Sequence, residues 1–189
     1  MNLDQLTFRP DEVKALSSII GQELLEVRYD SWSAELLFKA IALSLTPDEI
    51  DIPTEGNPYG DIVTIRVYSR SDSVIPSEYS VLQDCGMVRN VWILESSVEI
   101  ENPRQVEESE LIAGVKVPRG LGWNNNIYKS TTHGNDGLYR ATLGIQVETV
   151  NGIWLSLYTD AVGFFVLFHK GNELPEELND KCEKRKIEE

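Results

Sequence analysis

Residues 138–168 constrain the fold of this chain more than any other part of the sequence. Apolar residues fall at odd positions before Asn151, with polar residues between them, and the alternation resumes after Gly152. A period of two is typical of a β-strand that buries one face. The stretch therefore predicts two antiparallel strands joined by a tight turn, which is a β-hairpin.

The register of this hairpin depends on the length of its loop. A two-residue loop would place polar residues of the first strand on the same face as the leucines of the second. A loop of residues 150–152 instead pairs Val147 with Leu155, and it needs Gly152 in the left-handed conformation of a G1 bulge. We predict the three-residue loop, which turns Trp154 outward, opposite Glu148.

Similar patterns predict the other elements. Both faces of residues 62–68 are partly apolar, which is typical of a central strand packed on each side. The remaining elements that we predict are a helix over about residues 10–20, a strand over 25–29 with a turn over 30–33, and a tight turn or bulge at Lys39 and Ala40.

These elements predict a mainly β protein, in the sense of a β-rich α+β fold. We expect about eight to ten antiparallel strands, arranged as a sandwich or a partly open barrel, with an N-terminal helix. Residues 1–173 would form a single β-rich domain, followed by a charged C-terminal helix or tail over 174–189.

A short internal repeat suggests a further feature of the fold. The sequence IALSL at residues 41–45 matches IWLSL at 153–157 in four of five positions, and each copy follows a tight-turn candidate. Two pseudo-repeated hairpin modules would give this pattern. Five residues of strand sequence can also agree by chance, so both interpretations stay open.

Composition restricts the class of partner. The chain of 189 residues carries 31 acidic and 17 basic residues, a net charge of -14. Such a charge repels nucleic acids and anionic membranes and attracts a basic protein. The two cysteines lie far apart, residues 1–9 do not resemble a signal peptide, and no apolar run approaches the roughly 20 residues of a membrane span. We therefore expect a cytoplasmic protein with reduced thiols.

Residues 118–137 form the longest irregular stretch, and loops of that length inside a domain are often functional. Aromatic residues that face solvent are candidate binding anchors, whereas Trp92 lies in an apolar strand and is expected in the core. The candidate binding residues are Trp123, Asn125, Tyr128, His133 and Asp136 of this loop, together with Trp154 of the hairpin.

The same loop could in principle carry chemistry. His133 and Asp136 with His169 suggest a metal site, and Ser130 with His133 and Asp136 suggests a nucleophilic triad. Neither group has the spacing or the strand-turn-helix context that such sites show. We therefore predict no catalytic residue, no metal and no cofactor.

Two functions fit the sequence. The first is a non-enzymatic binding protein that docks a basic protein partner, for example an inhibitor of immunity type that faces a nuclease toxin. The alternative is a small-molecule binder or hydrolase that uses residues 118–137, with Tyr128, His133 and Asp136 as polar contacts. A ligand-sized pocket lined by those residues would favour the alternative.

Overall fold

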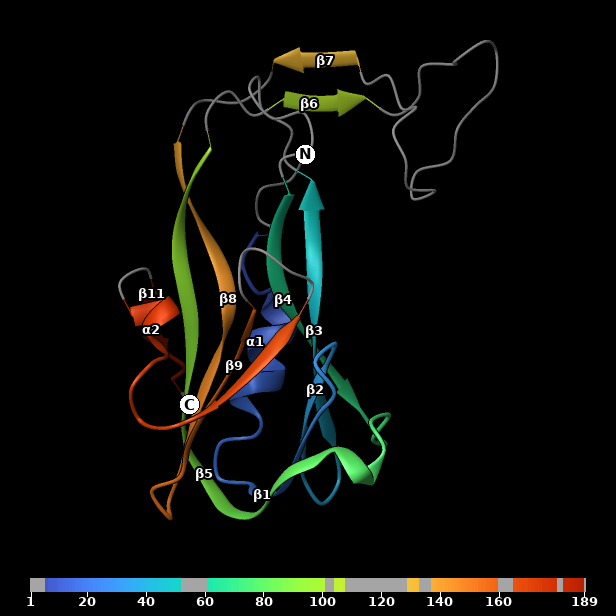
Figure 1. Ribbon diagram of the computed structural model, residues 1–189, viewed down its shortest axis with the longest axis vertical. Coiled ribbons are helices and arrows are strands. Elements are labelled where there is room, and N and C mark those ends of the chain that lie inside the picture. The colour runs from blue at the N-terminus through green and yellow to red at the C-terminus, as the bar shows by residue number, and fades with distance from the viewer. Residues whose placement is uncertain are drawn as a thin grey trace.

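A computed structural model describes residues 6–51, 61–100, 104–107, 129–132, 137–159, 165–179 and 182–188, and it shows a mainly β protein (Figure 1). The elements are α1 (Pro10–Ser17), β1 (Glu23–Tyr29), β2 (Ala34–Leu37), β3 (Ala42–Asp51), β4 (Asp61–Arg70), the 3-10 turn η2 (Ser77–Tyr79), β5 (Ser80–Ile100), β6 (Arg104–Glu107), β7 (Lys129–Thr132), β8 (Gly137–Thr149), β9 (Trp154–Thr159), β10 (Val166–Lys170), α2 (Glu176–Asn179) and β11 (Cys182–Lys186).

Nine of these strands form one antiparallel sheet in the order β10-β9-β8-β5-β1-β2-β3-β4, with β11 also paired to β5. The mainly β, antiparallel prediction is confirmed, and the sheet is not closed into a barrel. Strands β6 and β7 pair with each other. None of the helices in the described ranges has the length and the hydropathy that a membrane crossing requires.

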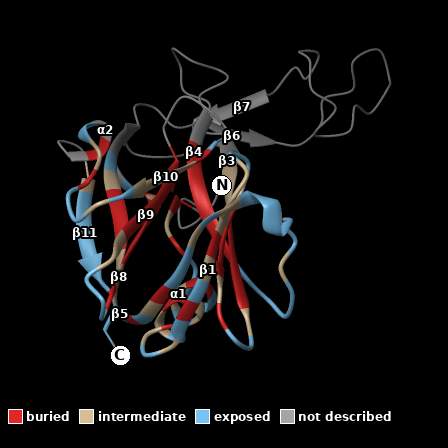
Figure 2. Ribbon diagram, turned by 60° about the horizontal axis from the view of Figure 1, so that its bottom comes forward, coloured by how far each residue is buried: buried red, intermediate tan, exposed pale blue. Residues whose placement is uncertain are grey.

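Strand β5 organises the sheet because it belongs to both of its halves. Its first part pairs with β1, whereas its second part pairs with β8 on one edge and with β11 on the other. Strand β4 contacts β8 and β9, so the two halves face one another. One cluster of buried apolar side chains fills the space between them, and Figure 2 shows buried residues along β4, β8 and β9.

The β8–β9 hairpin has the predicted register. Val147 pairs with Leu155, and Gly152 has a φ of 74°, in the left-handed region. The Thr149 N–H donates a hydrogen bond to the Ile153 carbonyl at 2.9 Å, which closes the loop. Trp154 lies opposite Glu148, as the three-residue loop requires.

Helix α1 begins at Pro10, as predicted, but it ends at Ser17, earlier than expected. The turn that follows ends at Gly21, whose φ is 79° and whose N–H donates to the Val88 carbonyl of β5. Leu16 of the helix and Ile19 of the turn are fully buried in the core. The chain must leave the helix early because both side chains pack against the sheet while the backbone turns toward β5.

The prediction that residues 62–68 form a central strand is wrong, since β4 is the last strand of the sheet order. Its second apolar face is explained by α1, which packs beside it. Glu12 of the helix accepts a hydrogen bond from the Val67 N–H at 3.0 Å. It also forms an ion pair with Arg66 at 3.3 Å, and the side chains of Glu12 and Arg66 are both buried. The helix therefore covers β4 in place of another strand.

Within the described part of the predicted helix or tail over residues 174–189, helix covers Glu176–Asn179 alone. Residues Cys182–Lys186 instead form β11, which pairs antiparallel with β5. Among them, Arg185 donates hydrogen bonds to Glu95, a buried carboxylate of β5. Pairing with a distant strand therefore overrides the helical pattern of charges.

Both copies of the short repeat lie in second strands of hairpins, β3 after β2 and β9 after β8, as the repeat hypothesis requires. The predicted turn at Lys39 and Ala40 is present, closed by a hydrogen bond from the Phe38 N–H to the Ile41 carbonyl. The structural equivalence of the two hairpins stays a prediction.

Candidate functional site

The candidate residues of the long loop, Trp123, Asn125, Tyr128, His133 and Asp136, lie outside the described residues. Of the predicted site, only Trp154 can be placed. The site must therefore be sought among surfaces that the described strands and helices build.

Trp154 lies on the outer face of the sheet and stacks on Trp92 of β5, with ring centroids 4.9 Å apart and an interplanar angle of 22°. Both rings are half-buried. The prediction that Trp92 lies in the core is wrong, because its neighbours Val91 and Ile93 occupy the inward positions of the strand. The two tryptophans instead cover part of the outer face of their own sheet.

Other parts of this outer face are covered by side chains of the chain itself. Lys184 Nζ donates to Gln146 Oε1 at 2.8 Å, and Gln146 Nε2 donates to Ser156 Oγ at 3.0 Å, so a line of hydrogen bonds crosses the sheet. Gln146 and Ser156 are fully buried. Leu174 and Leu178 pack over the neighbouring apolar residues. Trp154 therefore stabilises a covered face and does not by itself form an open binding site.

A second aromatic pair is far more exposed. Trp32 of the β1–β2 turn has 62% of its surface exposed and Phe165, just before β10, has 42%. Their ring centroids lie 5.2 Å apart at 48°. Tyr29 and Phe168 form another ring pair, with centroids 6.4 Å apart, and both pack against the core. We call these four residues the aromatic patch.

The turn that presents Trp32 is held by its own side chains. Asp30 Oδ1 accepts hydrogen bonds from the Trp32 N–H at 3.0 Å and the Ser33 N–H at 2.7 Å, and Ser31 takes a positive φ of 71°. The Val166 N–H of β10 donates to the Ser31 carbonyl at 2.9 Å. The two exposed rings are therefore fixed relative to each other by backbone contacts.

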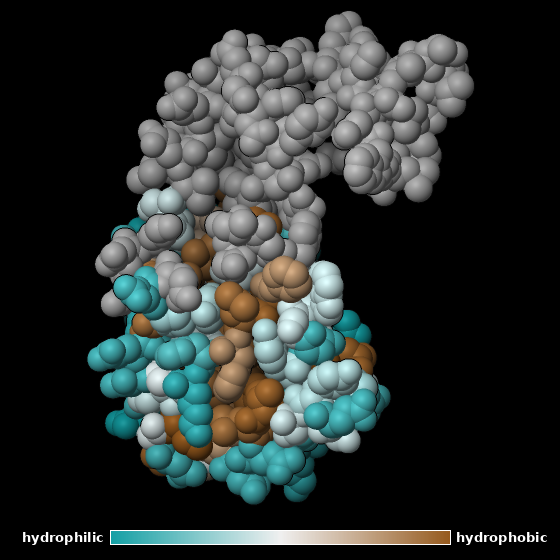
Figure 3. Space-filling model, viewed as in Figure 1, coloured by the Kyte–Doolittle hydropathy of each residue, from teal (hydrophilic) through white to brown (hydrophobic). Residues whose placement is uncertain are grey.

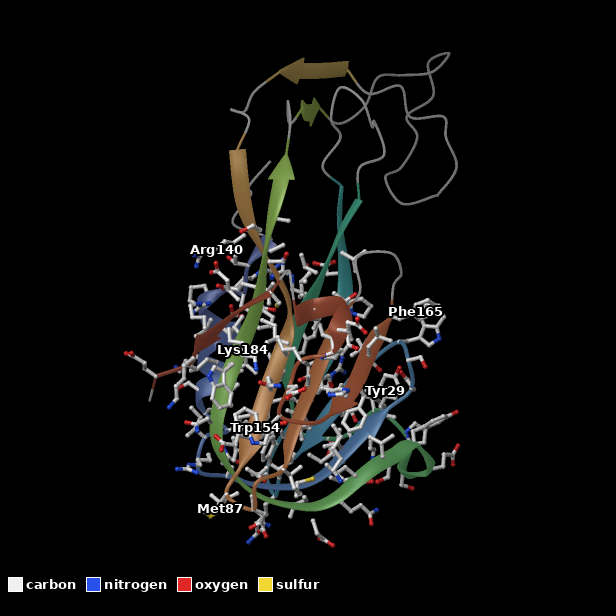
Figure 4. All side chains as sticks on the ribbon, turned by 60° about the vertical axis from the view of Figure 1, so that its left-hand side comes forward. Tyr29, Met87, Arg140, Trp154, Phe165 and Lys184 are labelled. Carbon is white, nitrogen blue, oxygen red and sulfur yellow. The ribbon has the colours of Figure 1, made fainter. Side chains whose placement is uncertain are left out.

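The surroundings of the patch are visible in two views. On the face where β10 crosses in front, apolar side chains gather in a strip between hydrophilic ones (Figure 3). Figure 4 shows Tyr29 and Phe165 on one side of the view and Trp154 and Lys184 on the other. The aromatic patch and the stacked tryptophans are thus separate features.

A groove of different character runs between α1 and β11. Its lining combines basic, hydroxyl and apolar residues, namely Pro10, Val13, Lys14, Ser17, Ser18, Arg185, Lys186, Ile187 and Glu188. Three of these side chains are cationic and one is anionic. The groove is therefore basic, although the whole chain is acidic.

Neither thiol is prepared for nucleophilic chemistry. Burial raises the pKa of Cys85 to about 11, and the nearby Asp84 adds to the rise. Burial likewise raises the pKa of Cys182 to about 11, with Glu95 contributing. Among the described residues, no three His, Cys, Asp or Glu side chains converge closely enough to hold a metal ion.

Comparison with protein-family models, with curated proteins and with solved structures gave no match for this chain. The evidence for each candidate site therefore comes from its geometry in this structure alone. Sequence reasoning missed Trp32 as an anchor, although a tryptophan within the polar turn DSWS was a usable signal, because such a turn cannot bury it. Phe165 gave no comparable signal, since it lies in an apolar run.

Proposed function

We propose that this protein is a non-enzymatic, cytoplasmic binding protein that docks a basic protein partner through the aromatic patch, as an inhibitor of immunity type would. One observation carries the proposal, the stacked and solvent-exposed pair of Trp32 and Phe165. Large rings that remain in water while already fixed in place are typical of interface anchors, which lose little entropy on binding.

Charge supports the choice of partner. A net charge of -14 favours encounter with a positively charged protein and disfavours nucleic acid and anionic lipid. The aromatic patch would supply most of the binding free energy, because truncated aromatic anchors typically cost about 2 kcal/mol or more. The acidic surface would mainly raise the rate of association.

We also infer that the bent sheet is a partly open barrel, and that the patch lies at its incomplete seam. Strand β10 is at one end of the sheet order, yet its first residue bonds to the β1–β2 turn and Phe168 contacts Tyr29. These contacts between β10 and the β1–β2 turn would hold the exposed rings of Trp32 and Phe165 in fixed positions.

The test is affinity capture from the native cell with the purified protein as bait. We expect a basic protein to be retained by the wild type and by Tyr79→Ala, a control that removes another ring exposed to 45%. Retention by Trp32→Ala should fall about tenfold or more, while its free energy of unfolding changes by less than about 1.5 kcal/mol. Salt should slow association.

Two results would contradict the proposal. Equal capture by the wild type and by both Trp32→Ala and Phe165→Ala would exclude the aromatic patch as the binding surface. Capture of an acidic protein, with an association rate that salt does not change, would exclude the electrostatic part of the proposal.

A further inference from the structure

We propose that the groove between α1 and β11 is a second docking site, which binds an extended acidic peptide segment of a partner protein as an added strand on β11. This site does not include any residue of the aromatic patch. Its chemistry is opposite to that of the remaining surface, so it selects a different class of ligand.

Unpaired cations are the first support for this proposal. Lys14 of α1 and Lys186 of β11 are exposed and line the groove from its two walls. Neither forms an ion pair with any residue in the described ranges. The groove also contains one carboxylate, Glu188, so the two lysines leave a local excess of positive charge in a chain with 31 acidic and 17 basic residues.

Arg185 also lines the groove. Its Nε and Nη2 atoms donate to Glu95 at 2.9 to 3.3 Å, which holds the guanidinium in one position. Glu95 also lies 3.6 Å from Arg140, which in turn lies 3.4 Å from Glu183. Because this cluster balances two arginines with two carboxylates, the excess positive charge of the groove comes from Lys14 and Lys186.

The backbone of β11 is the second support. Its residues pair with β5 from Cys182 opposite Ser96 to Lys186 opposite Trp92. Within the part of the chain that the structure describes, no strand pairs with the other edge of β11. An open strand edge offers N–H and C=O groups that an extended peptide can pair with. The partly buried side chain of Val13 lines the same groove and would contact an apolar residue of that peptide.

The charge of the whole chain restricts the ligand to a short acidic segment. A long polyanion such as RNA or an anionic membrane would extend beyond the groove and meet a net charge of -14. A peptide with a few carboxylates interacts mainly with charges within the Debye length, about 8 Å at physiological salt. The positive groove can therefore attract it locally.

The experiment measures the fluorescence anisotropy of a labelled peptide of about eight residues with alternating glutamate and valine, long enough to cover a short strand. We expect saturable binding at low salt to the full chain. The double variant Lys14→Glu with Lys186→Glu should bind about tenfold more weakly or worse. The control Lys170→Glu, an exposed lysine that does not line the groove, should bind like the wild type.

Two further comparisons separate strand addition from simple charge attraction. A peptide of the same charge with proline at alternate positions lacks the N–H groups for pairing and should bind much more weakly. If the double variant is less stable, the milder Lys14→Gln with Lys186→Gln provides the same comparison without charge reversal. Thermal unfolding of each variant shows that the measured protein is folded.

Several results would overturn the proposal. Equal binding by the charge-reversed and wild-type proteins would exclude the groove, and equal binding of the proline peptide would exclude strand addition. Absence of saturable binding at low salt would exclude the site altogether. Tighter binding of a single-stranded RNA oligomer than of the acidic peptide would show that the groove serves a different class of ligand.

Discussion

Glu35 of β2 is a buried carboxylate on which the loop of residues 71–76 depends. It is fully buried, and Oε1 accepts hydrogen bonds from Ser44 Oγ at 3.0 Å and the Val74 N–H at 2.9 Å. Oε2 accepts from Ser73 Oγ and from the Ile75 N–H at 3.2 Å. We therefore expect Glu35→Ala to detach this loop from the sheet.

The magnitude follows from the donors that would lose their acceptor. Ser73 Oγ retains the Ile75 carbonyl as a partner, and the exposed Val74 can turn to water. Ser44 Oγ and the Ile75 N–H, however, are buried and would be left unsatisfied. At about 1 to 3 kcal/mol for each of these two groups, the free energy of unfolding should fall by about 2 to 6 kcal/mol.

The pKa of Glu35 adds a test of pH dependence. Burial alone would raise the pKa of this carboxyl, but the hydrogen bonds from Ser73, Val74, Ile75 and Ser44 outweigh it and lower the pKa. A lowered folded-state pKa contributes stability above the ordinary glutamate pKa, and that stability is lost as the pH falls through the folded-state value. Glu35→Ala should therefore lose less stability than the wild type on acidification.

Urea unfolding at neutral pH and at a pH below the ordinary glutamate pKa of 4.5 measures both effects. Glu78→Ala is the matched control, because Glu78 is exposed in η2 and its removal should change the free energy of unfolding by no more than about 0.5 kcal/mol. A Glu35→Ala variant that loses less than about 1 kcal/mol and keeps the wild-type response to acid would refute the reasoning.

Two further predictions concern backbone and thiols. Gly152→Val should destabilise by more than about 1 kcal/mol in urea unfolding because its φ is 74°, and Gly144→Ala by more still, since a Cβ there would clash with the Leu157 carbonyl. Unchanged stability of Gly152→Val would contradict the bulged loop, and unchanged stability of Gly144→Ala would contradict the close approach of β9 to Gly144. Iodoacetamide at pH 8 should modify Cys182 about a hundredfold more slowly than free cysteine, because a pKa of about 11 leaves little thiolate; modification at the free rate would contradict that.

Local pattern was enough to predict the β8–β9 hairpin, because its register follows from residues close in sequence. Only a three-residue loop places Val147 and Leu155 on one buried face, and only Gly152 suits the positive φ that this loop needs. The turn at residues 30–33 was predictable for a related reason, since Asp30 can accept hydrogen bonds from the backbone that follows it.

Long-range pairing explains what the sequence did not predict. The charges of β11 follow the order of a helix, but the strand forms because β5 offers an edge and Glu95 lies beside it. The same holds for the candidate sites. Trp32 and Phe165 meet because Val166 bonds to Ser31, and no local pattern contains that contact.

Glu95 gives a final test of how β11 is held to the sheet. Its carboxylate is 4% exposed, yet Arg185 is 46% exposed, so solvent screens part of this ion pair and its removal should cost only about 1 to 2 kcal/mol. We expect Glu95→Gln to raise amide exchange in β11 about tenfold and to leave the amides of β9 unchanged. Hydrogen exchange followed by mass spectrometry measures both strands. Glu183→Gln, which removes an exposed partner of Arg140, should change neither. If β11 and β9 become equally faster in Glu95→Gln, the ion pair stabilises the whole fold, and β11 is not an independently opening strand.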